Sequence, residues 1–531
     1  MPAVQPRPAS VMPTLPLPPL APMPEVVRRG RLSERAAASF DAVVAIVPEQ
    51  ASPTLLAQLA HGERWRRLRA RPDARAGAVV STSLENSRDT RAILGILDRK
   101  ATPFETLSLA ARALKEAAPR HPERLALAAP AAEGAAPAVL SALITAALAN
   151  AFEMPTFRKP AAAKRRIRRI EAIDAAGVDQ KYIEACAEGN NLARYLTALP
   201  SNVLDARAYR RFIVELGREH RLAVRWLDER ALERLGAGAF LAVSRGSAAR
   251  TAGVAQVSYR PGRRPRSVGR GSTGPRGAPD LALVGKGIVF DTGGTNLKPH
   301  RAMLDMHIDM AGSAVALATL VALSRLGAPI SADAWLAVTD NAIGPSAYRP
   351  QDVVCASNGT TIQVVHTDAE GRMVLADTLA LAARTEPRLV IDFATLTGSC
   401  VAALTERMSG VFTNEPQLTE ALIAAGRSSG ERVWNFPCDA DYDTDLESKV
   451  ADVLQCAVEG KGDHILATRF LSRFVPERTP WVHVDLSAAL RPGGLGPIPT
   501  DVTGFGVRYA LELILKTRVL DQLPGERAAR R

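Results

Sequence analysis

The sequence contains few cysteines and no pattern that would pair them. The 531 residues hold five, widely spaced, and no C-x-x-C motif: Cys186, Cys355, Cys400, Cys438 and Cys456. This spacing excludes a disulfide framework and a cysteine-based zinc site. A reducing cytosol is therefore the compartment we expect.

Export and membrane-spanning segments are also missing. The first 24 residues are proline-rich and lack a charged start followed by a continuous apolar core, so we expect no secretory leader. The longest apolar region, residues 135–152, is interrupted by Pro137, Ser141, Thr145 and Asn150. We expect a buried or amphipathic helix there and no membrane span, hence a cytoplasmic protein without a membrane partner.

Several well-known catalytic motifs do not occur. The sequence has no H-E-x-x-H, no G-x-S-x-G, no Walker loop and no G-x-G-x-x-G after a strand. If the protein is an enzyme, its chemistry therefore rests on another arrangement of residues.

The composition is that of a folded protein with a basic balance. Hydrophobic residues make up 47% and charged residues 23%, and the length suffices for two or three domains. The net charge of +12 permits a nucleic-acid or anionic-membrane partner. It does not require one, because the excess lies partly in the basic stretches 164–169 and 261–277. A solvated linker and an exposed loop are the preferred explanations of these two stretches, and contact with a nucleic acid or an acidic partner is the alternative.

The first third of the chain predicts a tail and a small α/β domain. Residues 1–30 read as a proline-rich tail, passive or a ligand for a proline-reading domain. Over residues 31–170, short apolar runs alternate with helical patterns, which indicates a domain of strands and helices. The strands are expected at 42–47, 78–82 and 125–128, and the helices at 106–118 and 139–149.

Residues 171–531 predict a larger α/β domain. A helical stretch at 181–199 leads into it. Short apolar runs typical of parallel strands buried on both faces follow at 281–290, 334–338, 362–365, 389–394 and 481–486. Helical patterns come between them at 310–326, 373–384 and 418–428. We therefore expect a mostly parallel central sheet flanked by helices.

Charged residues collect where these strands are expected to end. Lys286, Asp291, Lys298 and Asp309 interrupt or follow apolar elements. In the segment 365–377, three more charges occupy alternate positions, namely Asp368, Glu370 and Arg372. That alternation predicts an extended segment that aims three charges one way, between a strand and a helix.

The gathered carboxylates predict a cation site. In a doubly wound sheet, ligands bind outside the carboxyl ends of the strands. Carboxylates that converge there repel one another unless cations neutralise them, and two divalent ions close together would do so. Taken singly, each residue also has a simpler explanation, since aspartates cap helices and lysines reach solvent from strands. His366, two residues before Asp368, could be a metal ligand, could support a neighbouring ligand, or could serve only in packing.

These residues lie in motifs that resemble those of the leucyl (cytosol) aminopeptidase family of dinuclear metallopeptidases. The motifs are VGKG (284–287), FDTGG (290–294), KP (298–299), DM (309–310), TDAEGR (367–372) and ATLTG (394–398). They follow the family's order and spacing, and the resemblance is strong from about 281 to 414. His366 and Met373 depart from the family's usual Asn and Leu, but no expected ligand is lost.

The resemblance implies a site with two divalent metal ions, Mn²⁺ or Zn²⁺, with Mg²⁺ and Co²⁺ as further candidates. Asp291 and Glu370 would bridge the two ions. Lys286 and Asp309 would complete the tighter site, and Asp368 the more exchangeable one.

The resemblance also implies the catalytic and substrate-binding residues. Arg372 would hold a bicarbonate ion that acts as general base, and Lys298 would stabilise the developing oxyanion. The residues expected to bind the substrate are Met306, Thr395, Leu396 and Gly398.

The implied activity is the removal of N-terminal, Leu-like residues from peptides with a free N-terminus. The family fold has a smaller N-terminal α/β domain and a larger catalytic one, and assembles as a homo-hexamer of two trimers. Some bacterial members bind DNA, so DNA binding is a candidate second role.

Overall fold

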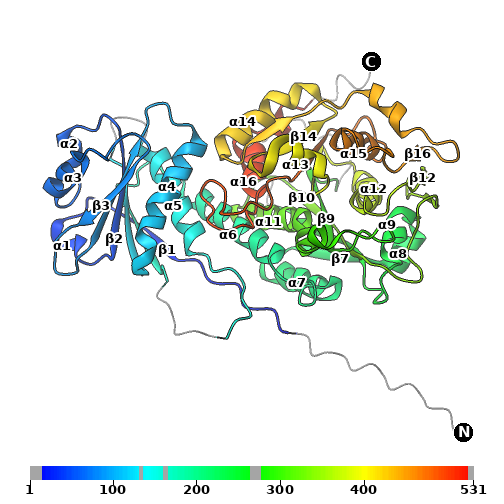
Figure 1. Ribbon diagram of the computed structural model, residues 1–531, viewed down its shortest axis with the longest axis horizontal. Coiled ribbons are helices and arrows are strands. Elements are labelled where there is room, and N and C mark those ends of the chain that lie inside the picture. The colour runs from blue at the N-terminus through cyan, green and yellow to red at the C-terminus, as the bar shows by residue number, and fades with distance from the viewer. Residues whose placement is uncertain (1–14, 131–135, 160–165, 263–276, 524–531) are drawn as a thin grey trace, which may run out of the picture.

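The computed structural model describes residues 15–130, 136–159, 166–262 and 277–523, and these form two parts side by side along the longest axis (Figure 1). The basic stretch 261–277 lies almost entirely outside the described residues, as do residues 1–14 of the tail and 164–165 of the first basic run.

The first part is built on a six-stranded sheet in the order β1-β6-β5-β2-β4-β3, parallel except for the pair β3/β4. Its strands are β1 (Glu25–Arg29), β2 (Ala42–Pro48), β3 (Val79–Ser83), β4 (Arg91–Leu97), β5 (Arg124–Ala128) and β6 (Arg169–Ile173). Helices α4 (Pro103–Ala117) and α5 (Ala136–Ala151) pack on one face, and the shorter α1 (Glu34–Ala37), α2 (Pro53–Leu56) and α3 (Gly62–Arg69) on the other.

The strands and helices predicted between residues 42 and 149 are confirmed. The strand β1, however, lies within the segment expected to be tail, because residues 25–29 pair with β6. Within the apolar region 135–152, residues Ala136–Ala151 form the mostly buried helix α5, as predicted. The exact domain boundaries stay predictions.

The second part is built on an eight-stranded sheet in the order β15-β14-β17-β13-β9-β10-β8-β7. Its four central strands, β17, β13, β9 and β10, run parallel to one another. The strands are β7 (Ala223–Asp228), β8 (Gly253–Tyr259), β9 (Leu281–Asp291), β10 (Ala332–Asn341), β13 (Leu389–Ala394), β14 (Ser409–Thr413), β15 (Val433–Asn435) and β17 (Trp481–Asp485).

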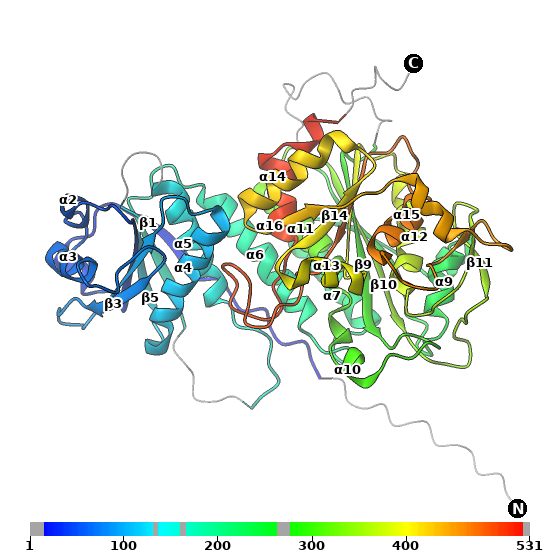
Figure 2. The ribbon, with the colours of Figure 1, turned by 45° about the horizontal axis from the view of Figure 1, so that its top comes forward.

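Helices cover both faces of this sheet (Figure 2). Successive side chains of β9 face opposite cores: Leu281 and Leu283 face one, and Ala282 and Val284 face the other. The first core contains α6 (Gln180–Thr197), α7 (Ala206–Glu219), α11 (Ala311–Leu326), α14 (Thr419–Ser429) and α16 (Val507–Leu511). The second contains α8 (Glu229–Arg234), α9 (Gly238–Ser244), α12 (Glu370–Ala383) and α15 (Asp463–Ser472). Helix α6 also packs against α5, which joins the two parts.

Two predictions about the second part are wrong. The run 362–365 is not a central strand, because β12 (Thr361–Gln363) pairs with β11 (Val353–Cys355) and β16 (Val453–Leu454) in a separate small sheet. The segment after Asp368 is not extended, because α12 already begins at Glu370. Two charges of the alternating set therefore lie in the first turn of a helix.

One segment of the described chain, His300–Leu326, is long and apolar enough to cross a membrane by length and composition. Its apolar window is 83% buried inside the molecule, as expected for the core helix α11. All five cysteines are free, in agreement with the absence of a disulfide pattern.

Candidate metal centre

The candidate site lies at the carboxyl edge of the four parallel central strands. Asp291 is the last residue of β9, Asn341 of β10 and Asp485 of β17, while Thr395 directly follows β13. Because adjacent parallel strands end at the same edge of a sheet, residues distant in sequence meet there.

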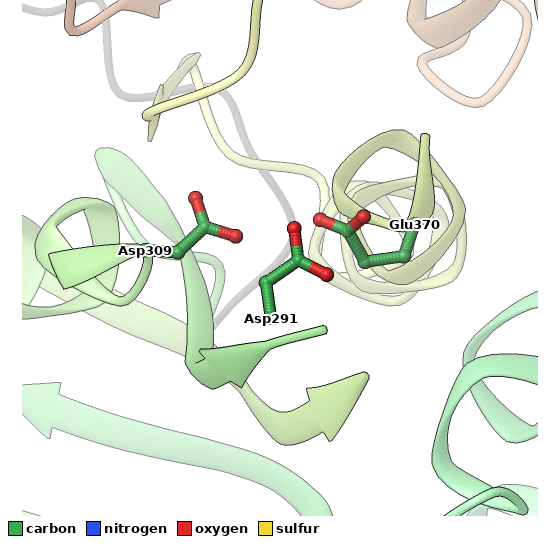
Figure 3. Close-up of side chains that lie close together, drawn as sticks. All are labelled: Asp291, Asp309 and Glu370. Carbon is green, nitrogen blue, oxygen red and sulfur yellow. The ribbon is translucent and has the colours of Figure 1, made fainter. Parts of the chain in front are cut away.

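Three buried carboxylates converge at this edge. Oxygen atoms of Asp291, Asp309 and Glu370 all lie within 4.8 Å of one another. Each comes from a different element: the end of β9, the turn before α11 and the first turn of α12 (Figure 3). The arrangement concentrates negative charge where little water reaches it.

Lys286, inside β9, forms ion pairs with two of these carboxylates. Its Nζ lies 2.8 Å from Oδ2 of Asp309 and 2.9 Å from Oε1 of Glu370, and it donates to the carbonyl of Thr395 at 3.0 Å. Burial disfavours the charged lysine, but the carboxylates of Asp309, Glu370 and Asp291 outweigh this and raise the pKa of Lys286. A cation is therefore strongly favoured at this position.

Lys298 forms ion pairs on the other side of the cluster. Its Nζ lies 3.0 Å from Oδ2 of Asp291 and 2.5 Å from Oδ1 of Asp368.

The carboxylates nevertheless disfavour one another's charge. Burial and the charge of Asp291 raise the pKa of Glu370, and the same two causes raise the pKa of Asp309 although Lys286 opposes them. The cluster thus carries more negative charge than its surroundings easily accommodate.

The donor set fits divalent metal ions. Four carboxylates and the Lys286 side chain converge, and oxygen atoms of three of the carboxylates lie within 4.8 Å of one another. Divalent ions there would lower the pKa of Lys286, so that its neutral amine could also be a ligand. Oxygen and nitrogen donors of this kind suit Mn²⁺, Zn²⁺, Mg²⁺ and Co²⁺.

Several supporting residues were not predicted from the sequence. Asn341 donates from Nδ2 to Oδ1 of Asp291 at 2.8 Å, and the Tyr348 hydroxyl donates to the Thr367 carbonyl at 2.8 Å. Asp485 accepts from the Leu396 backbone N–H at 3.1 Å and from the Thr397 hydroxyl at 2.6 Å. Polar residues at the ends of otherwise apolar strands were the pattern that could have indicated Asn341 and Asp485.

A cavity of about 820 Å³ opens over the carboxylates. It is lined by every residue predicted for the site: Lys286, Asp291, Lys298, Met306, Asp309, Asp368, Glu370, Arg372, Thr395, Leu396 and Gly398. The structure therefore brings all of them together around one cavity.

Two predicted residues have unexpected neighbours. Arg372 lies two residues after Glu370 in α12, and its Nη2 lies 2.7 Å from Oδ2 of Asp463, a carboxylate that the sequence did not predict for the site. His366 accepts at Nδ1 from the backbone N–H of Asp368 at 3.3 Å, which fits a supporting role.

Residues 191–511 match the model of the "Cytosol aminopeptidase family, catalytic domain". The chain belongs to this family. Among relatives of this aminopeptidase, a "Probable cytosol aminopeptidase" of Syntrophotalea carbinolica is 40% identical over 65% of this chain and 69% of that protein. A "Probable cytosol aminopeptidase" of Chlorobaculum tepidum is 38% identical over 65% of this chain and 66% of its own length.

Solved structures are similar to the aminopeptidase over almost its whole length. A mutant of tomato leucine aminopeptidase has a TM-score of 0.79 at 25% identity and covers 94% of this chain and 99% of its own. The manganese complex of the bottromycin maturation enzyme BotP has a TM-score of 0.75 at 30% identity, covering 90% of this chain and 99% of its own. The predicted two-part α/β fold and the family resemblance are thereby confirmed.

Proposed function

We propose that this aminopeptidase removes Leu-like residues from the N-terminus of peptides with the help of two divalent metal ions. The observation that carries the proposal is the convergence of Asp291, Asp309 and Glu370, buried and within 4.8 Å, at the floor of the large cavity. The manganese in the similar BotP structure supports Mn²⁺ as one candidate, beside Zn²⁺, Mg²⁺ and Co²⁺.

In this proposal, Asp291, Glu370, Lys286, Asp309 and Asp368 would hold the two ions. When bound, the ions supply a water of lowered pKa and polarise the substrate carbonyl. Asn341 holds Asp291 by a 2.8 Å hydrogen bond, so the carboxylate is oriented before the substrate arrives. Lys298, which pairs with Asp291, is 14% exposed and lines the cavity. It stabilises the negative charge that develops on the carbonyl oxygen of the substrate.

The lining of the cavity supports a preference for substrates with a Leu-like N-terminal side chain. The predicted residues Met306, Thr395, Leu396 and Gly398 line the same cavity as the apolar residues Ile308, Val401 and Leu490. An apolar pocket of this kind favours Leu-like residues through burial of their surface. Asp485 fixes the backbone of Leu396, and so holds a peptide edge against which the substrate aligns.

The test is removal and return of the metal. The protein is treated with chelator, supplemented with Mn²⁺ or Zn²⁺, and assayed with leucine p-nitroanilide and with an N-acetylated peptide. We expect activity only with metal and only on the free N-terminus. Activity that ignores metal, or equal cleavage of the blocked peptide, would refute the proposal.

We further propose a cytoplasmic homo-hexamer, as the family resemblance implies, and light scattering of the purified protein measures its mass. The free cysteines support a reducing compartment. No nucleic-acid role is proposed. The buried Glu171 pairs with Arg29, Arg124 and Arg169 at 2.7–3.0 Å and offsets one of their three positive charges.

A further inference from the structure

Arg372 forms an ion pair with a carboxylate of the chain, that of Asp463. Its side chain is 2% exposed and its Nη2 lies 2.7 Å from Oδ2 of Asp463, while Nη1 donates to the Gln455 carbonyl at 3.3 Å. Burial disfavours the charged guanidinium, but the Asp463 carboxylate outweighs this and raises the pKa of Arg372. The arginine is thus held by a partner supplied by the chain.

A bicarbonate ion on Arg372, as the resemblance implied, does not fit this arrangement. An ion on the same guanidinium would lie beside the Asp463 carboxylate, which already contacts Nη2 at 2.7 Å, so that two negative charges would share one arginine. Like charges so placed repel strongly. We therefore derive no step through bicarbonate.

Asp463 is built into the site. It is the first residue of α15 and follows Gly462, whose φ of +62° lets the chain turn into the helix. The start of a ten-residue helix stabilises a negative side chain. Asp463 lines the cavity together with Arg372 and Glu370, and it is 24% exposed, so a water in the cavity can reach it.

The other acidic residues of the cavity wall outside the carboxylate cluster have different partners. Glu459 pairs with Lys461 at 2.9 Å, and Glu406 lies 3.4 Å from Arg491. Asp485 is committed to the backbone of Leu396 and to Thr397. Among the described residues that line the cavity, Asp463 is thus the carboxylate held by Arg372.

We propose that Asp463 replaces an external bicarbonate as the anion on Arg372 and as the proton acceptor of the reaction. This rests on the proposed aminopeptidase function. An O–H bond of the attacking water breaks, its proton passes to a carboxylate oxygen of Asp463, and the hydroxide forms a bond to the peptide carbonyl carbon. When the C–N bond breaks, Asp463 returns the proton to the leaving nitrogen. Arg372 positions the carboxylate throughout.

The first test needs only the wild-type protein. In buffer depleted of carbon dioxide, the metal-loaded enzyme should be fully active, and added bicarbonate should change neither kcat nor Tm. A saturable rise of activity together with a rise of Tm on addition of bicarbonate would overturn the proposal.

The second test uses Asp463→Ala and the isosteric Asp463→Asn. Without bicarbonate, kcat should fall about a hundredfold or more, as for loss of a general base. Bicarbonate should raise the Tm of Asp463→Ala and restore part of its activity, because the vacated guanidinium then accepts the ion. Asp443→Ala is the matched control. Asp443 pairs at 2.7 Å with Arg469, which lies in α15, the helix that begins at Asp463. Asp443 does not line the cavity, so no bicarbonate response is expected.

The two readouts separate the two proposals. If the metal-loaded wild type shows no peptidase activity, the proposed function fails. The change in Tm of Asp463→Ala on addition of bicarbonate still tests whether Asp463 is the anion bound by Arg372. If Asp463→Ala and Asp463→Asn are as active as the wild type without bicarbonate, Asp463 is not the proton acceptor and this inference fails alone.

Discussion

The Nζ of Lys286 lies 2.9 Å from Oε1 of Glu370 although both side chains are almost completely buried. A lysine in the middle of a parallel strand thus reaches a carboxylate in the first turn of a helix on the sheet face. Together with Lys298, which contacts Asp291 and Asp368, it offsets part of the negative charge of the carboxylate cluster.

We expect the protein to stay folded when metal is removed, because these lysines remain to compensate the carboxylates. Chelated protein should unfold in one cooperative transition at a lower Tm, measured by scanning calorimetry. Loss of the transition on chelation would show that the ions, and not the lysines, hold this edge of the sheet together.

Lys286→Met should destabilise the chelated protein by about 3–5 kcal/mol, because it leaves buried charges without a partner. Lys461→Met is the control, since Lys461 is 88% exposed and its pair with Glu459 contributes little. Denaturant unfolding of the two variants measures the difference. Equal stability of the two would contradict the buried ion pairs.

Lys298→Ala should lower kcat about 10²–10³-fold, the usual effect of removing one group that stabilises an oxyanion. The metal content, measured by elemental mass spectrometry, should remain nearly unchanged. Lys298→Arg keeps the charge and should retain more activity than the alanine variant. A parallel loss of metal and activity would instead assign Lys298 to the holding of the ions.

Gly312→Ala should disturb the packing of α11 against the sheet. A Cβ there would lie 2.0 Å from the backbone oxygen of Phe393 in β13, and backbone cannot move aside as a side chain would. We expect a loss of about 1–3 kcal/mol, typical of overpacking, seen as a lower Tm. Gly30→Ala, where a Cβ meets nothing within 4 Å, should leave the Tm unchanged.

A buried histidine predicts a pH dependence of stability. The His483 Nδ1 lies 2.6 Å from Oδ1 of Asp392, whose other oxygen accepts from Trp481 at 2.6 Å. Burial disfavours the imidazolium, but the charge of Asp392 outweighs this and raises the pKa of His483. The stabilisation is therefore complete below the unfolded pKa of about 6.5 and is lost as the pH rises through the higher folded value.

His483→Asn should remove this pH dependence. The Tm difference between wild type and variant should be largest near pH 6 and should shrink as the pH rises. A difference that is constant or grows with pH would show that His483 is neutral in the folded protein.

The central strands were predictable because burial on both faces leaves uninterrupted apolar runs such as 281–290 and 389–394. The start of α12 was not, because the buried charges Glu370 and Arg372 break the apolar period by which a helix is usually found. The run 362–365 was misplaced for a related reason: a short apolar strand does not show which sheet it joins.

The two-part α/β architecture, the family and the residues gathered around the cavity follow from the apolar runs and the motif spacing, because both are local properties of the chain. Which charges meet depends on how the elements pack. Asn341 reaches Asp291 and Asp463 reaches Arg372 because the strand and helix ends are packed side by side, across separations of 50 and 91 residues. The strength of such an interaction depends on the distance between the atoms in space, and the order of residues along the chain does not give that distance.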